Sequence, residues 1–261
     1  MQHILPRPAR SIALLLISAA LTACASARDP RDPLEPLNRG VYKFNEAVDK
    51  AVLKPVAKGY KAVVPPPLQT GVTNFFSNFT DVTSAINDLL QGKIRAAASD
   101  VGRIAVNSTV GILGVFDVAS RIGFEKHNED FGQTLGAWGV APGPYLVLPF
   151  LGPSDFRDTV GLVAEYYTDP EFYLFTHSPE NWIVFGTRVI NLRANLLDSE
   201  RIFDVAAMDK YAFLRDAYLQ RRRSRIFDGR PPASEVPGQG ERRKTLKEME
   251  EELDEPLPPE K

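Results

Sequence analysis

Residues 38–53, NRGVYKFNEAVDKAVL, decide the fold class of this 261-residue chain. Val41, Phe44 and Val48 recur at the three- and four-residue spacing of an α-helix, so they share one apolar face. Charged side chains occupy the other faces: Arg39, Lys43, Glu46, Asp49 and Lys50. The pattern predicts an amphipathic helix, and Pro55 predicts an interruption after it.

The same helical spacing continues along the chain, whereas the two-residue alternation of a strand is scarce. The best strand candidate is Tyr145–Phe150, and Pro149 weakens it. We therefore predict an all-α domain, with Asp81 as a helix N-cap and Gly92 as a helix stop. Further helices are expected over 69–79, 81–90, 93–110, 153–167, 179–198 and 204–224.

The N-terminus has the parts of a secretory signal. Arg7 and Arg10 precede the apolar stretch Ile12–Leu21, which is too short to span a bilayer as a helix. Leu21-Thr22-Ala23-Cys24 follows and is similar to the cleavage motif of bacterial lipoproteins. We expect residues 1–23 to be removed and lipid to be attached to Cys24. The alternative is an ordinary signal peptide followed by a buried cysteine.

The mature chain is expected to have three parts. Residues 24–31 form a short lipidated leash, 32–225 form the helical domain, and 226–261 form a charged, Pro- and Gly-rich tail that is expected to be disordered. The chain carries 31 Lys and Arg against 33 Asp and Glu. This balance argues against a nucleic-acid-binding protein, which usually shows a basic stripe.

One internal segment, Phe131–Ser154, contains no charged residue. Its repeated glycines and prolines rule out a continuous membrane-spanning helix. Irregular backbone at membrane depth is tolerated only where protein shields it or where it lines a cavity. The segment is therefore either a buried irregular core element or the lining of a passage.

Signals of catalysis are weak. His127-Asn128-Glu129-Asp130 offers possible metal ligands, but neighbours in sequence do not converge without a specific fold. No nucleophile-elbow motif is present. We expect no enzyme activity, no metal site and no cofactor. Asp155, Arg157 and Asp158 either cap a helix and pair locally or form a polar constellation at a pocket entrance.

Several motifs resemble the MlaA (VacJ) family of lipoproteins over nearly all of residues 32–222. The motifs are Asp32-Pro33-Leu34-Glu35-Pro36-Leu37-Asn38-Arg39, Tyr42-Lys43-Phe44-Asn45, Asn107–Gly114, Glu129–Gly139, Gly143-Pro144-Tyr145 and Arg157-Asp158.

The resemblance implies a ring-like helical protein in the inner leaflet of the outer membrane, facing the periplasm. It implies an amphipathic channel that removes misplaced phospholipid from the outer leaflet and passes it to a soluble periplasmic carrier (MlaC-like). It also implies association with a trimeric porin. Residue Ala25, where an aspartate would resemble an inner-membrane retention signal, favours the outer membrane.

The resemblance also assigns candidate roles to residues. Tyr42, Phe44 and Asn45 are the candidate gating region of the channel. The candidate lipid-path residues are Phe131, Leu135, Trp138, Tyr145, Leu148 and Phe150. Two other functions stay open: a structural, porin-associated lipoprotein without a lipid path, and a lipidated envelope hydrolase that uses carboxylates such as Glu129 and Asp130.

Overall fold

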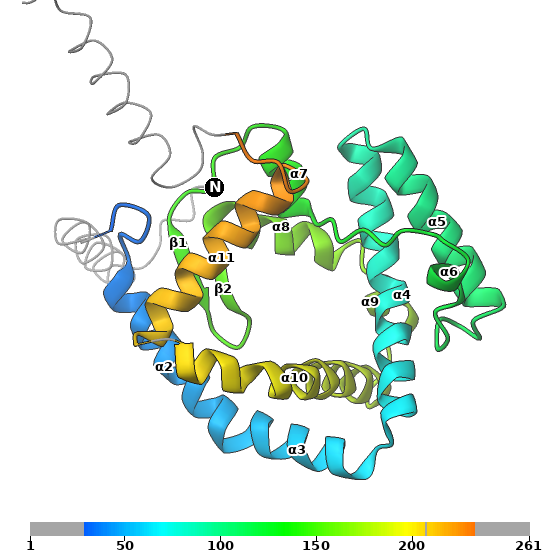
Figure 1. The fold of residues 1–261 in the computed structure, drawn as a ribbon, viewed down its shortest axis with the longest axis horizontal. Coiled ribbons are helices and arrows are strands. Elements are labelled where there is room, and N and C mark those ends of the chain that lie inside the picture. Colours follow the sequence, from blue (N-terminus) through cyan, green and yellow to red (C-terminus); the bar gives the residue numbers. More distant parts are fainter. Residues whose placement is uncertain (1–28, 207, 233–261) are drawn as a thin grey trace, which may run out of the picture. The chain divides into compact units, whose positions relative to one another are not determined.

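The computed structural model describes residues 29–206 and 208–232 (Figure 1). The chain divides into two compact units after Tyr218. The described residues are mostly helical, as predicted, with one short two-stranded sheet. The elements are α2 (Glu35–Val48), η1 (Asp49–Leu53), α3 (Lys54–Val63), α4 (Pro66–Leu90), α5 (Ile94–Thr109), α6 (Val118–Arg121), α7 (Phe131–Ala137), β1 (Tyr145–Leu148), β2 (Gly152–Asp155), α8 (Phe156–Tyr166), α9 (Glu171–Leu174), α10 (Glu180–Ala206) and α11 (Lys210–Ile226).

The helix predicted over 38–53 is the first part of a longer helical run. It begins at Glu35, passes through a turn of π-helix at Asp49–Leu53 and continues into α3. The prediction that Pro55 interrupts the helix was wrong, because the helical run continues through Pro55. The π turn lets the Lys54 N–H donate to the Asp49 carbonyl, and this wider turn accommodates a proline that has no N–H of its own.

The two helices predicted over 69–90 are one helix, α4. Asp81, predicted as an N-cap, lies buried in the middle of α4, where its carboxylate accepts from Arg103 Nε at 3.0 Å. Gly92 does end α4, in the left-handed conformation that glycine tolerates (φ 75°). The chain then reverses into α5, which packs along α4.

The uncharged segment 131–154 folds into α7, a turn and most of a β-hairpin. The predicted strand is β1, which ends before Pro149, and β2 returns antiparallel with Tyr145 opposite Asp155. The helix predicted from Pro153 begins only at Phe156, because Asp155 caps it. The helix predicted over 204–224 is the end of α10 followed by α11.

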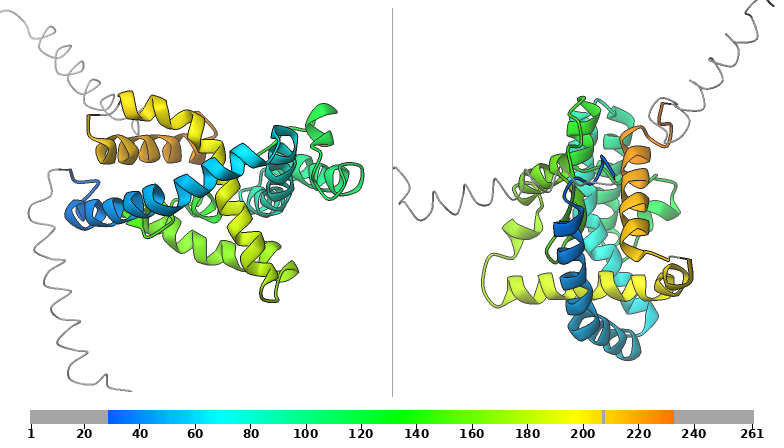
Figure 2. Two further views of the ribbon diagram at one scale, coloured as in Figure 1. Left: turned by 90° about the horizontal axis from the view of Figure 1, so that it is seen from below. Right: turned by 90° about the vertical axis from the view of Figure 1, so that its left-hand side faces the viewer.

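Packing contacts in the first unit close a circuit. The run α2–η1–α3 packs on α10, α10 packs on α4, and α4 packs on α7 (Figures 1 and 2). The circuit continues through α8 and the hairpin back to α2, which contacts β1. A closed circuit of packed elements is what the ring-like arrangement implied by the family resemblance requires.

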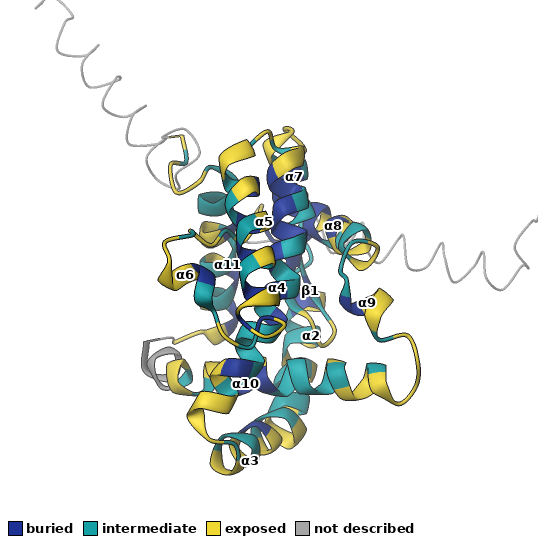
Figure 3. Ribbon diagram, turned by 90° about the vertical axis from the view of Figure 1, so that its right-hand side faces the viewer, coloured by how far each residue is buried: buried dark blue, intermediate teal, exposed yellow. Residues whose placement is uncertain are grey.

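The polarity of the first unit is inverted relative to an ordinary water-soluble domain. Among its described residues, the largest fully buried side chains are mainly polar or charged, whereas many large apolar side chains are exposed. Figure 3 shows where buried and exposed residues lie along the ribbon. No helix within residues 29–206 or 208–232 combines the length and apolar character needed to cross a membrane.

Candidate functional site

Asn38 joins the amphipathic helix α2 to strand β1. Its side chain is buried, and its amide Nδ2 donates to the Tyr145 carbonyl at 2.9 Å. Its Oδ1 accepts from the Val147 N–H, also at 2.9 Å. The Asn38 side-chain amide thus forms the two hydrogen bonds that the backbone of a neighbouring strand would form. It satisfies backbone groups on the edge of β1 that faces away from β2.

Asn45 repeats this arrangement two helical turns later, at the hairpin turn. Its Nδ2 donates to the Leu148 carbonyl at 2.9 Å, and its Oδ1 accepts from the Phe150 N–H at 2.8 Å. Phe150 has a left-handed backbone (φ 64°), which non-glycine residues rarely adopt. Asn45 therefore holds the turn in a strained conformation that displays Phe150.

The hairpin tip presents apolar side chains outward. Phe150 and Leu151 are 70% and 69% exposed, and Phe44 on α2 is 47% exposed. The rings of Phe44 and Phe150 meet edge to face, with centroids 5.3 Å apart. We call Phe44, Asn45, Phe150 and Leu151 the tip cluster.

The other predicted site residues lie in three places. Leu148 lies beside the tip cluster, where its carbonyl accepts from Asn45. Tyr42 packs edge to face on Tyr211, and burial raises the pKa of Tyr42. Tyr145 is buried and packs on the same Tyr211 ring. Phe131, Leu135 and Trp138 lie on or beside α7, which packs on α4 and α8; the Trp138 indole donates to the Leu90 carbonyl at 3.1 Å.

Asp155, Arg157 and Asp158 come together at the base of the hairpin and are all buried. Asp155 Oδ1 accepts from the Asp158 N–H at 2.7 Å and so caps α8. The Arg157 guanidinium donates to both carboxylates, at 3.3 Å to Asp155 and 3.0 Å to Asp158. The three residues therefore do the capping and local pairing considered for them, and their role at an entrance stays a prediction.

Sequence reasoning missed a buried carboxylate, Asp32. It accepts from Asn38 Nδ2 at 2.8 Å and from the Tyr211 hydroxyl at 2.5 Å, and Arg215 NH1 lies 3.5 Å away. Burial and the bond to Asp32 raise the pKa of Tyr211. Asp32 fixes the start of α2 beside α11. The one feature of the sequence that could have indicated this role is the position of Asp32 at the start of the first motif that resembles the MlaA family.

A second set of polar groups lies on α4, α5 and the loop after α6. Asp88, Asp100 and His127 each offer a ligand atom, and these atoms lie within 4.8 Å of one another. Glu129 and Asp130, the carboxylates considered for hydrolysis, have structural partners. Glu129 accepts from Gln91 and Lys93, and Asp130 caps α7 through the Gln133 N–H.

Comparisons with known proteins agree on one family. A family model described as MlaA lipoprotein matches residues 30–225. The chain is 32% identical over 228 residues to the Intermembrane phospholipid transport system lipoprotein MlaA of Haemophilus influenzae, covering 83% of this chain and 90% of that protein. It is 34% identical over 221 residues to the protein of that name from Escherichia coli, covering 81% and 86%.

An uncharacterized protein of Rickettsia bellii is 35% identical over 200 residues, covering 76% of this chain and 78% of that protein. Among solved structures, one described as "Structural basis for maintenance of bacterial outer membrane lipid asymmetry" matches with a TM-score of 0.65 at 33% identity. The match covers 76% of this chain and 99% of that chain.

Proposed function

The chain belongs to the MlaA lipoprotein family, and we propose that it moves phospholipid out of the outer leaflet of the outer membrane along a path that passes the tip cluster. Relatives in this family are named as lipoproteins of intermembrane phospholipid transport. The observation that carries the proposal is the inverted polarity of the first unit, with polar side chains inside and apolar side chains outside.

Inverted polarity suits a protein that lies in one leaflet. Exposed apolar surface is favourable against acyl chains and costly against water, at about 25 cal/mol per Å². Amphipathic helices such as α2 and α3 can lie in the membrane interface with their apolar faces toward the acyl chains. The buried polar groups then supply an interior where a charged headgroup costs less to place than in hydrocarbon.

The tip cluster suits the place where an acyl chain meets this polar interior. Its aromatic rings are exposed and pack on each other. The Leu148 carbonyl and the Phe150 N–H at the turn form hydrogen bonds with Asn45 and do not depend on water. A turn held in this way can stand at membrane depth without unpaired backbone groups. We propose that Phe44 and Asn45, with Tyr42 behind them on α2, control access to the lipid path.

Location and partners complete the proposal. Cys24, which lies outside the described residues, carries the lipid anchor, and the protein sits in the periplasm-facing leaflet of the outer membrane. A soluble carrier of the MlaC kind receives the phospholipid, and a trimeric porin holds the protein in place. The protein performs no covalent chemistry, in keeping with the structural use of Glu129 and Asp130.

Site-specific photocrosslinking in intact cells tests the lipid path. A photoreactive residue at Phe150 or Leu151 should form phospholipid adducts. The matched control is Lys50, which lies on the polar face of the same helical run as Phe44 and is 63% exposed at its side chain. Adducts at Lys50 as abundant as those at Phe150 would contradict a path at the tip cluster.

A second measurement separates transport from mere residence in the membrane. Cells that lack the protein should accumulate outer-leaflet phospholipid, measured by its accessibility to an added phospholipase, and the native chain should reverse this. Porin crosslinks without lipid adducts, together with normal phospholipid accessibility in the absence of the protein, would instead favour the structural, porin-associated function.

A further inference from the structure

Two aspartates are buried side by side on the helical hairpin of α4 and α5. Asp88 lies near the end of α4 and Asp100 in α5, and both are 0% exposed. Asp88 Oδ1 and Oδ2 and Asp100 Oδ2 have no hydrogen-bond partner among the described residues. Burial of the Asp88 carboxyl, with Asp100 beside it, raises the pKa of Asp88. Asp100 Oδ1 accepts from the His127 N–H at 3.3 Å, so the oxygens without a partner are both of Asp88 and one of Asp100. Buried carboxylate oxygens without partners are costly, so something must offset their charge.

The same helix shows how this protein neutralises a buried acid elsewhere. Asp81 lies two turns before Asp88 on α4 and is also fully buried. Arg103 Nε donates to Asp81 Oδ2 at 3.0 Å, and Lys126 Nζ lies 3.0 Å from Asp81 Oδ1. Within residues 29–206 and 208–232, neither Asp88 nor Asp100 forms such an ion pair with an arginine or a lysine.

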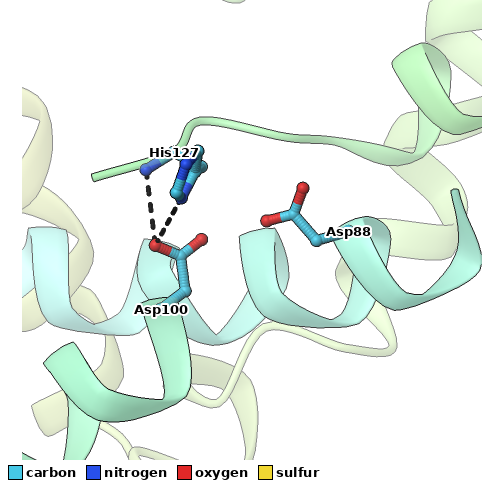
Figure 4. Close-up of side chains that lie close together, drawn as sticks. All are labelled: Asp88, Asp100 and His127. Atoms are coloured by element: carbon cyan, nitrogen blue, oxygen red, sulfur yellow. Dashed lines mark hydrogen bonds and ion pairs between the residues drawn. The ribbon is translucent and has the colours of Figure 1, made fainter. Parts of the chain in front are cut away.

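What faces the two carboxylates is an imidazole. His127 comes from the loop between α6 and α7, and its Nδ1 lies 3.2 Å from Asp100 Oδ1 (Figure 4). Figure 4 shows the Asp88 carboxylate directed toward Asp100 and His127. The loop is fixed in this place, because Ser84 Oγ donates to the His127 carbonyl and accepts from the Glu129 N–H, both at 3.2 Å.

We propose that Asp88, Asp100 and His127 bind a divalent transition-metal cation of the Zn²⁺ type. The three ligand atoms lie within 4.8 Å of one another. Metal bonds of about 2.0–2.2 Å in a tetrahedral site place ligand atoms roughly 3.3–3.5 Å apart, so a small inward movement of the side chains completes the set. The cation would give a positive partner to the Asp88 carboxylate and to Asp100 Oδ2, the oxygens that accept no hydrogen bond from the described residues.

The ligand chemistry selects the class of cation. Ca²⁺ and Mg²⁺ take oxygen ligands and rarely bind imidazole, whereas Zn²⁺ binds a mixture of His nitrogen and carboxylate oxygen. Three protein ligands leave a fourth position for water. The His127 side chain is 27% exposed, which gives a cation a route from solvent.

A bound cation would join three segments. It would tie the end of α4 and the middle of α5 to the loop that leads into α7, an element of the packing circuit. The loop would then depend on the metal for part of its rigidity, and removal of the metal should loosen the connection to α7.

The test uses the full-length lipidated protein in detergent, with an affinity tag that contains no histidine. After chelation and dialysis, Zn²⁺ binding is measured by calorimetry and by elemental analysis. We expect one Zn²⁺ per chain, at least tenfold weaker binding in Asp88→Asn and in His127→Gln, and no comparable binding of Ca²⁺. Asp198→Asn and His177→Gln are the matched controls, because both residues are exposed and lie outside the cluster.

Three results would overturn the proposal. The first is that the native chain binds no stoichiometric Zn²⁺ and that metal-free Asp88→Asn melts at a higher temperature than the metal-free native chain. A proton shared by Asp88 and Asp100 would then explain how the two aspartates are buried. Another is equal Zn²⁺ binding in native, Asp88→Asn and His127→Gln chains. The third is loss of binding in His177→Gln instead. If Asp88→Asn fails to fold, Zn²⁺ binding by His127→Gln decides between these outcomes. The His127 side chain is partly exposed, so this substitution should leave the fold intact.

Discussion

Asn38 and Asn45 lie seven residues apart on α2 and hold two successive parts of the same β-hairpin. Asn38 pairs with Tyr145 and Val147 of β1, and Asn45 pairs with Leu148 and Phe150 at the turn. Seven helical residues rise about 10.5 Å, and three strand residues span about 10 Å. The spacing of the two asparagines therefore matches the spacing of the backbone groups that they bind.

Substitution Asn45→Asp should release the turn while keeping the shape of the side chain. A carboxylate cannot donate to the Leu148 carbonyl and would repel it, so we expect a loss of about 1–2 kcal/mol in the free energy of unfolding. We also expect altered phospholipid exposure at the cell surface, measured with an added phospholipase.

The matched control for this substitution is Asn195→Asp on α10, where the amide donates one exposed hydrogen bond to Thr73. It should change neither stability nor surface phospholipid appreciably. Unchanged phospholipid accessibility in Asn45→Asp, at normal protein levels, would argue against a gating role for the tip cluster.

Substitution Asn38→Ala should be more damaging. It leaves the Tyr145 carbonyl, the Val147 N–H and an oxygen of Asp32 without a partner in a buried place. Each such loss costs about 1–3 kcal/mol, and the losses are not fully additive, so we expect about 3 kcal/mol in total. Thermal unfolding in detergent measures the loss, and faster hydrogen exchange at the Val147 amide should accompany it. Slow exchange at that amide would contradict the role assigned to Asn38.

The sequence predicted the features of this site that depend on local spacing. The apolar face of α2 with Phe44 follows from helical periodicity, and the strand at Tyr145 follows from its short apolar run. Capping by Asp155, one of the two roles that the sequence allows for it, is confirmed, because an aspartate just before a helix has a local partner.

Features that depend on distant partners could not be predicted. The carbonyl that Asn38 binds lies 107 residues further along the chain, and on a helix an isolated asparagine reads as one more polar surface residue. The sequence predicts Asp81 as an N-cap because it does not show that Arg103, which neutralises Asp81, lies beside it from 22 residues away on another helix. The sequence groups His127 with its neighbours Glu129 and Asp130, whereas the acids close to His127 in the structure come from α4 and α5.

The N-cap of α6 predicts a pH dependence. Burial alone would raise the pKa of Asp117, but hydrogen bonds from Ser120 and Asn107 and the charge of Arg103 lower it to about 2. An unfolded aspartate has a pKa of about 3.9, so the stabilisation is fully present above about pH 4 and is lost as the pH falls toward 2.

Substitution Asp117→Asn isolates this contribution. The variant should be less stable than the native chain by about 1 kcal/mol at pH 6, a figure reduced for solvent screening, and the difference should shrink between pH 4 and pH 2. Melting temperatures across this range measure it, with Asp198→Asn as an exposed control. A difference that stays constant from pH 6 to pH 2 would show that the Asp117 charge is not responsible.

The tip cluster should hold the protein on a membrane independently of the lipid anchor. A chain with Cys24→Ser, which cannot be lipidated, should still bind vesicles of zwitterionic phospholipid through its exposed apolar side chains. Adding Phe150→Ser removes an aromatic side chain that is exposed in the protein, so it should leave the fold intact. It should weaken vesicle binding about tenfold, because burying a phenylalanine contributes roughly 1.5–3 kcal/mol.

Lys50→Ser in the same Cys24→Ser chain is the control for that measurement. It exchanges an exposed side chain on the polar face and loses only an ion pair with Glu46. Vesicle flotation should therefore show near-normal binding for Lys50→Ser and reduced binding for Phe150→Ser. If the Cys24→Ser chain does not bind vesicles at all, the anchor at Cys24 alone holds the protein, and the exposed apolar side chains must be covered by another protein in the cell.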